Sequence, residues 1–116
     1  MKCDFKTLEQ SIADWNRIRF PDADLRSQLK KLYEELVEFN ESGSMEELAD
    51  VFIANAAVRY RFKYRVLAWF VKFAMRKHYT GREQELFDAI VKKMEKNKVR
   101  VFEKLSDGSW HHVGED

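Results

Sequence analysis

The sequence predicts an all-α protein, a single bundle of about four to five helices followed by a short C-terminal tail. Its 116 residues are the length of one domain. One proline and four glycines are too few for a fold built from many turns. The apolar residues, 45% of the chain, recur with helical spacing. We assign residues 1–100 to the helical domain and residues 101–116 to the tail.

The first two helices are predicted from regular apolar stripes. The first begins after Asp4, a suitable N-cap, and ends before Pro21. Asp22 or Asp24 can cap the second. The stripe of the first helix, at spacings of 3, 4 and 3, consists of Phe5, Leu8, Ile12 and Trp15. The stripe of the second, at spacings of 4, 3, 4 and 3, consists of Leu25, Leu29, Leu32, Leu36 and Phe39.

A break at residues 42–44 separates the second helix from a third. Ser44 followed by Glu47 has the pattern of a capping box, so the third helix should begin directly after Ser44. Residues 48–58 are almost entirely apolar, which predicts a helix buried nearly all round. Asp50 is the acidic exception within this segment, and its position calls for an explanation.

The second half of the chain holds two further predicted helices. Residues 59–65 alternate basic and aromatic side chains, a pattern that fits a continued, bent or ended helix equally well. Helices are expected at 66–78 and, after a break at 80–81, at 82–98. In the tail, residues 106–109 have the composition of a hairpin turn.

Composition also bears on compartment and assembly. Cys3 is the only cysteine, and no signal-peptide pattern opens the chain, so we expect a cytoplasmic protein without disulfides or membrane spans. Residues 1–58 hold 12 acidic and 7 basic side chains, whereas residues 59–116 hold 8 and 14. The segments 48–58 and 66–75 have more apolar surface than a monomer of this size is expected to cover, which favours a homodimer or homotetramer.

Two acidic pairs flank the break in the helical hairpin. Counted from Gly43, Glu38 lies five residues back and Glu47 four forward, while Glu35 lies eight back and Asp50 seven forward. In an antiparallel hairpin these pairs should face each other, and each pair shares one helix face.

Four carboxylates brought this close together repel one another. Two like charges about 4 Å apart cost on the order of 4 kcal/mol at an effective dielectric constant near 20. Protonation, surrounding Lys or Arg side chains, or divalent cations can offset this cost. Oxygen ligands of this kind select hard cations such as Mg²⁺. Glu35 or Glu38 could also accept a proton from an attacking water.

The acidic motifs resemble those of the MazG-like all-α nucleoside triphosphate pyrophosphohydrolases. The match consists of KLYEELVE at residues 31–38 followed by EELADV at residues 46–51, where the family has EExxE and then ExxD. Further resemblance extends upstream to Trp15 and Arg19-Phe20 and downstream to residues 93–100. The family implies that Glu35, Glu38, Glu47 and Asp50 hold Mg²⁺.

The resemblance also implies an activity. A (d)NTP would be cleaved between its α and β phosphates, giving the monophosphate and pyrophosphate, as in cleaning of the nucleotide pool. Hydrolysis of phosphoribosyl-ATP is a related alternative. Residues that would contact the substrate are Lys31, Lys93, Asn97 and Arg100 at the phosphates and Trp15 and Asn16 at the base. Trp15 also fits plain core packing, and the basic residues near 93–100 also fit a helix C-terminus.

A non-catalytic nucleic-acid or partner-binding module is the rival from another class. The basic and aromatic alternation at 59–65 is typical of surfaces that stack nucleic-acid bases. The acidic first half opposes it, because it would repel a phosphate backbone. His111 and His112 have no partner at zinc-like spacing, so we interpret them as surface residues.

Overall fold

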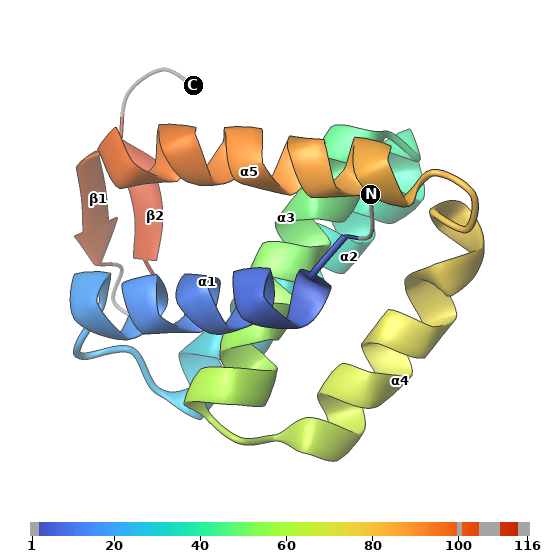
Figure 1. The fold of residues 1–116 in the computed structure, drawn as a ribbon. Coiled ribbons are helices and arrows are strands. Elements are labelled where there is room, and N and C mark those ends of the chain that lie inside the picture. Colours follow the sequence, from blue (N-terminus) through green and yellow to red (C-terminus); the bar gives the residue numbers. More distant parts are fainter. Residues whose placement is uncertain (1–2, 100, 105–109, 114–116) are drawn as a thin grey trace.

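Five α-helices account for most of the chain, which confirms the predicted all-α class (Figure 1). The structure is a computed structural model that describes residues 3–99, 101–104 and 110–113, with side chains over residues 3–99. No helix within these residues is both long and apolar enough to cross a membrane. The elements are α1 (Phe5–Arg19), α2 (Leu25–Ser42), α3 (Met45–Ala56), a π-helical turn (Ala57–Arg61), α4 (Arg65–Met75), a 3-10 turn (Arg76–His78), α5 (Glu83–Val99), β1 (Val101–Lys104) and β2 (Trp110–Val113).

The first two helices begin at the predicted caps. The Asp4 carboxylate accepts a hydrogen bond from the Thr7 backbone N–H at 3.0 Å, which satisfies one of the free donors of the first turn of α1. Asp24 accepts from the Ser27 backbone N–H at 2.8 Å, and the Ser27 hydroxyl lies 3.1 Å from the Asp24 N–H, so the two residues form a capping box at the start of α2.

The turn between α2 and α3 is also the predicted one. Gly43 ends α2 in the left-handed conformation, with φ of 66°, and its N–H donates to the Phe39 carbonyl. Ser44 then caps α3 by accepting from the Glu47 backbone N–H at 3.1 Å. Because both ends of this short turn are fixed by local hydrogen bonds, the two helices leave it in a defined antiparallel register.

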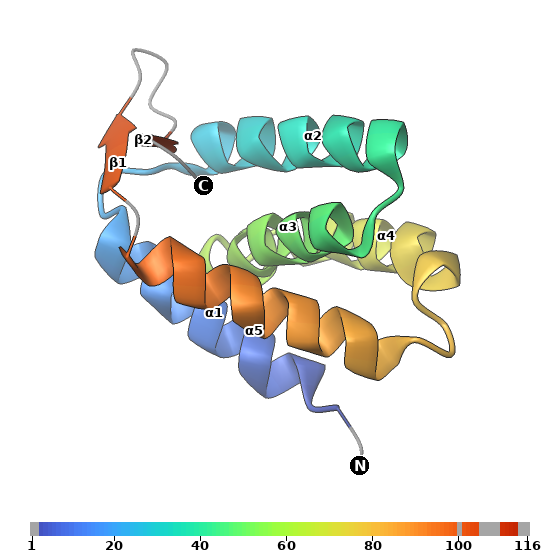
Figure 2. The ribbon, with the colours of Figure 1, turned by 90° about the horizontal axis from the view of Figure 1, so that it is seen from above.

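Helix α3 forms the centre of the bundle. Figure 2 shows it between α2 on one side and α1 with α5 on the other. Its buried residues, Met45, Leu48, Ala49, Val51, Phe52, Ala54, Asn55 and Ala56, leave little of the helix exposed. The apolar surface of segment 48–58 is therefore covered within the subunit. The exposed apolar surface that the sequence predicted for a monomer lies on α4.

The basic and aromatic segment 59–65 is where the third helix ends. The chain passes through the π-helical turn, reaches a left-handed residue at Lys63 with φ of 62°, and starts α4 at Arg65. Arg61 is held inside this corner, since its guanidinium donates to the Asn16 side-chain oxygen at 2.6 Å and to the Ala23 carbonyl at 3.2 Å. Arg61 therefore joins the end of α1 and the following loop to the end of α3.

A buried ion pair ties α4 to α1. Glu9 is 1% exposed, and its carboxylate accepts a hydrogen bond from the Lys72 ammonium at 2.8 Å. The pair could not be predicted from the sequence, because Lys72 interrupts the apolar segment 66–75 but its partner lies 63 positions away.

We expect Lys72→Met to lower the free energy of unfolding by about 2–3 kcal/mol, because it leaves the Glu9 carboxylate buried without its partner. Urea denaturation at pH 7 measures the change. The double variant Glu9→Leu/Lys72→Met should recover most of the loss, and Lys92→Met, an exposed lysine on α5, should stay within about 0.5 kcal/mol of wild type. Equal effects of the two lysine substitutions would contradict a structural role for the pair.

Two strands of the C-terminal tail pair within the described residues, and the predicted turn at 106–109 lies outside them. Strands β1 and β2 pair antiparallel, with Val101 opposite Val113 and Lys104 opposite Trp110. His111 and His112 lie on β2 opposite Glu103 and Phe102 in the backbone register. Their side chains are outside the described residues, so their predicted surface position stays a prediction.

Candidate metal centre

Three of the four predicted carboxylates converge across the α2–α3 hairpin. Oxygen atoms of Glu35, on α2, and of Glu47 and Asp50, on the first two turns of α3, all lie within 4.8 Å of one another. The register set by Gly43 and Ser44 produces this meeting. It is the one group of this kind among the described side chains.

Glu38, the fourth predicted ligand, borders the cluster one helical turn after Glu35. Its side chain is exposed, and it shares a hydrogen bond with Glu35. Its negative charge also helps to raise the pKa of Glu47. Glu38 thus lies at the solvent edge of the cluster, next to the three carboxylates that converge.

Glu35 is the deepest carboxylate of the group. Burial, together with the hydrogen bond to Glu38, raises the pKa of Glu35 to about 8, and the nearby charge of Asp50 acts in the same direction. This raised pKa favours the protonated form of Glu35 at neutral pH. The pKa of Glu47 is raised as well, first by burial and then by the charges of Asp50 and Glu38.

Two lysines accompany these carboxylates. The Lys31 ammonium lies 3.6 Å from Glu35, one turn away on the same helix, and the Lys93 ammonium on α5 lies 3.2 Å from Asp50. The pair with Lys93 explains how an acidic residue is accommodated in the apolar helix α3. Without a metal the charges are thus offset by protonation and by lysines.

The donor set nevertheless fits a hard divalent cation. It offers carboxylate oxygens alone, from residues held on two rigid helices, which suits Mg²⁺ or Mn²⁺ and disfavours softer metals. Glu35, Glu47 and Asp50 would supply the first ligands, and Glu38 lies close enough to join them. A cation here would also lower the pKa of Glu35, because the charged form would gain a partner.

The structure places only some of the predicted phosphate contacts at the acidic cluster. Asn97 is half-buried one turn beyond Lys93, and its amide donates to the Met94 sulfur at 3.8 Å. Arg100 lies outside the described residues, so its role stays a prediction. Lys31 and Lys93 are the two predicted phosphate contacts that the structure places at the acidic cluster.

The two predicted base contacts lie on α1 and have other partners. Trp15 is half-buried and packs edge to face on Phe20, with ring centroids 5.5 Å apart. Asn16 is buried, and its side-chain oxygen accepts the 2.6 Å hydrogen bond from Arg61. The predicted role of Asn16 at a base edge stays a prediction, but its contact with Arg61 also fixes the corner after α1. The sequence could not reveal it, since Arg61 is 45 positions away.

Lys93→Met is expected to shift two affinities in opposite directions. Removing the ammonium beside Asp50 should raise the affinity for Mn²⁺ without nucleotide by roughly 3- to 10-fold, because the cation no longer competes with a lysine. Affinity for a triphosphate chain should fall by about 10-fold or more, because a charged donor is lost. Isothermal titration with Mn²⁺ and with a nonhydrolysable triphosphate measures both.

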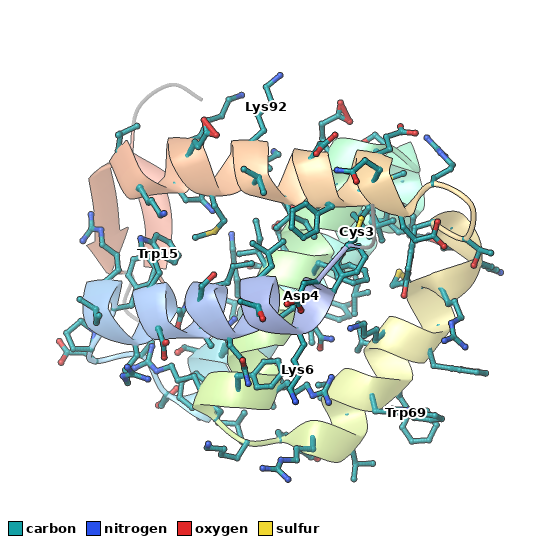
Figure 3. The ribbon with its side chains drawn as sticks, in the orientation of Figure 1. Cys3, Asp4, Lys6, Trp15, Trp69 and Lys92 are labelled. Atoms are coloured by element: carbon teal, nitrogen blue, oxygen red, sulfur yellow. The ribbon has the colours of Figure 1, made fainter. Side chains whose placement is uncertain are left out.

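The matched control is Lys92→Met, whose lysine points outward from α5 in Figure 3 and should change neither affinity. If Lys93→Met instead weakened Mn²⁺ binding as strongly as Asp50→Asn, Lys93 would be needed to build the site and our account of its competition with the cation would fail.

Comparison with known proteins yields a limited likeness. No family model and no curated protein matches the chain. Among solved structures, the chain is similar to the cyanophage S-2L MazG-like pyrophosphohydrolase bound to dGDP and three catalytic Mn²⁺ ions per active site. The similarity covers 100% of this chain and 99% of that one, at 22% identity and a TM-score of 0.48. That protein carries the family description that the acidic motifs suggested, but a likeness at this level assigns no activity.

Proposed function

We propose that this protein is a nucleotide pyrophosphohydrolase that uses Mg²⁺ to convert a (d)NTP into its monophosphate and pyrophosphate. The observation that carries the proposal is the meeting of Glu35, Glu47 and Asp50 across a capped hairpin, with lysines at its edge. The MazG-like spacing of the acidic motifs supports the same activity. A role in cleaning the nucleotide pool follows from this chemistry.

The residues divide the work by position. Glu35, Glu47 and Asp50 would hold the cation, which when bound would supply charge neutralisation for the phosphates and an activated water. Lys93 and Lys31 can turn from their carboxylate partners toward phosphate oxygens once a cation takes their place. Of the two predicted bases, Glu38 is the better placed, because it is exposed beside the cluster while Glu35 is buried within it.

The nucleic-acid-binding alternative loses part of its support. Of the basic side chains in segment 59–65, Arg61 is held by Asn16 and the loop after α1, and Arg59 stacks over the neighbouring Tyr60 ring at 4.9 Å. These contacts give some of the basic and aromatic side chains in this segment a role in the fold. Asp50 and its neighbours have no role in that alternative.

A substrate panel tests the proposal. The protein is incubated with the common dNTPs and NTPs and with phosphoribosyl-ATP, each with and without Mg²⁺, and the products are separated by chromatography. We expect equal amounts of monophosphate and pyrophosphate from at least one triphosphate, and none when the cation is chelated. Release of inorganic phosphate and a diphosphate, or no metal-dependent turnover of any member, would overturn the proposal.

A further inference from the structure

The outer side of α4 carries large apolar side chains that the bundle does not cover. Val66 is 67% exposed, Trp69 and Phe70 are each 57% exposed, and Phe73 is 59% exposed. We call these four residues the aromatic face. Trp69 stacks on Phe73 with ring centroids 5.3 Å apart, and it meets Phe70 edge to face at 5.2 Å. Figure 3 shows Trp69 pointing away from the rest of the molecule.

Positive charge surrounds the aromatic face. Residues 59–77 contain seven basic side chains and no acidic one. Arg65 and Lys77, both exposed, mark the two ends of the face. Lys72 is turned toward the buried Glu9 instead and takes no part in this surface. A partner for α4 should therefore combine apolar contacts with negative charge.

Helix α2 of the same chain offers that combination. Residues 32–42 of α2 contain four acidic side chains and no basic one. Tyr33 is 68% exposed and Val37 is 40% exposed, one helical turn apart on α2. Glu34 and Glu41 flank this pair at helical spacing, and we call Tyr33, Glu34, Val37 and Glu41 the acidic strip.

We propose that the aromatic face of α4 docks on the acidic strip of α2 in a second copy of the chain. Helices α2 and α4 both pack on α3, and Phe39 of α2 contacts His78, in the 3-10 turn directly after α4, edge to face at 4.8 Å. The C-terminal ends of the two helices therefore lie close together, and a two-fold axis that faces both surfaces would form the contact twice. The inference does not depend on the proposed activity.

Size and charge favour this arrangement over a direct pairing of the two α4 helices. A large aromatic side chain buries roughly 150–250 Å². One half-exposed face therefore falls short of the about 800 Å² per subunit that a standard interface buries, and two such contacts approach it. Pairing α4 with α4 would form the contact only once and would bring the basic flanks of both helices together.

Sedimentation equilibrium of the full chain tests the interface. We expect a wild-type dimer and, for Trp69→Glu, an increase of at least about 30-fold in the dissociation constant, since a central aromatic residue is lost and a charge is added. Circular dichroism checks that the variant folds, as its exposed side chain allows. Ile18→Glu is the matched control: Ile18 is 75% exposed on α1, and the dimer should persist.

A charge exchange tests which surfaces meet. Variant Arg65→Glu/Lys77→Glu and variant Glu34→Lys/Glu41→Lys should each be monomeric alone, and an equimolar mixture should form dimers, because opposite charges then face each other at both contacts. If the Glu34/Glu41 variant dimerised like wild type, the acidic strip would not be the docking site.

A wild-type chain that stays monomeric at high micromolar concentration would also overturn the proposal. So would binding of that monomer to vesicles containing anionic lipid that Trp69→Glu abolishes, since the aromatic face would then serve a membrane surface.

Discussion

Asp50→Asn is expected to lower Mg²⁺-dependent hydrolysis of the preferred triphosphate by at least about 10³-fold while the protein remains folded. The substitution keeps the shape of the side chain but removes the charge that a cation would bind. It also removes the partner of Lys93, which is 20% exposed and can turn to solvent, so the fold should lose little. Steady-state kinetics with a pyrophosphate assay measures the loss.

Two further variants make this experiment specific. Glu38→Gln should also remove turnover, because it takes away the carboxylate best placed to accept a proton, but it should weaken Mn²⁺ binding less than Asp50→Asn does. Glu46→Gln is the matched control, since Glu46 is exposed on the same helix beside Glu47 and outside the cluster. Unchanged turnover in both Asp50→Asn and Glu38→Gln would sink the assignment of the site.

The part of the site that could be predicted from sequence is the part built from local signals. The caps at Asp24 and Ser44 and the left-handed Gly43 fix the ends of α2 and α3 through hydrogen bonds between residues at most four positions apart. Given these ends, helical geometry alone brings Glu35 toward Asp50. The predicted meeting of the two acidic motifs therefore needed no knowledge of the remaining chain.

What the sequence could not show depends on contacts between distant segments. Arg61 belonged to the basic segment that supported the rival nucleic-acid interpretation, but its partners lie on α1 and in the loop after it. Lys93 was predicted as a phosphate contact, and its pairing with Asp50 could be seen only once α5 was placed beside α3. In each case the residue type indicated that the side chain would bind a polar or oppositely charged group. Only the packing of distant segments determined which group it contacts.

The stability of the metal-free protein is expected to fall as the pH rises from about 5 to about 8. The unfolded-state pKa of Glu35 is near 4.5, whereas burial and Glu38 raise its folded-state pKa to about 8. Between these values the folded state holds a proton that the unfolded state has released. The contribution is therefore fully present below the lower pKa and is lost through the upper one, with about 5 kcal/mol as its ceiling.

The groups facing Glu35 determine how large this loss becomes. Lys31 reduces it, because its charge lowers the pKa of Glu35, while Asp50 and Glu38 increase it. Glu47 contributes with the same sign, since its pKa is raised too. The capping carboxylates Asp4 and Asp24 have lowered pKa values and lose their contribution only in more acidic solution, so the chosen window separates the two effects.

Thermal unfolding at several pH values, with EDTA or with Mn²⁺, measures this dependence. Glu35→Gln should flatten this pH dependence, make the metal-free protein more stable than wild type above pH 8, and abolish stabilisation by Mn²⁺.

In wild type, stabilisation by Mn²⁺ should grow with pH, because at lower pH the cation must first displace the proton. Glu95→Gln, an exposed change on α5 outside the acidic cluster and outside the proposed interface, should behave like wild type. If Glu35→Gln destabilised the metal-free protein at every pH, the carboxyl group would serve the fold. A gain in stability together with loss of turnover would instead mean that the chain retains a costly buried acid for the cation it binds.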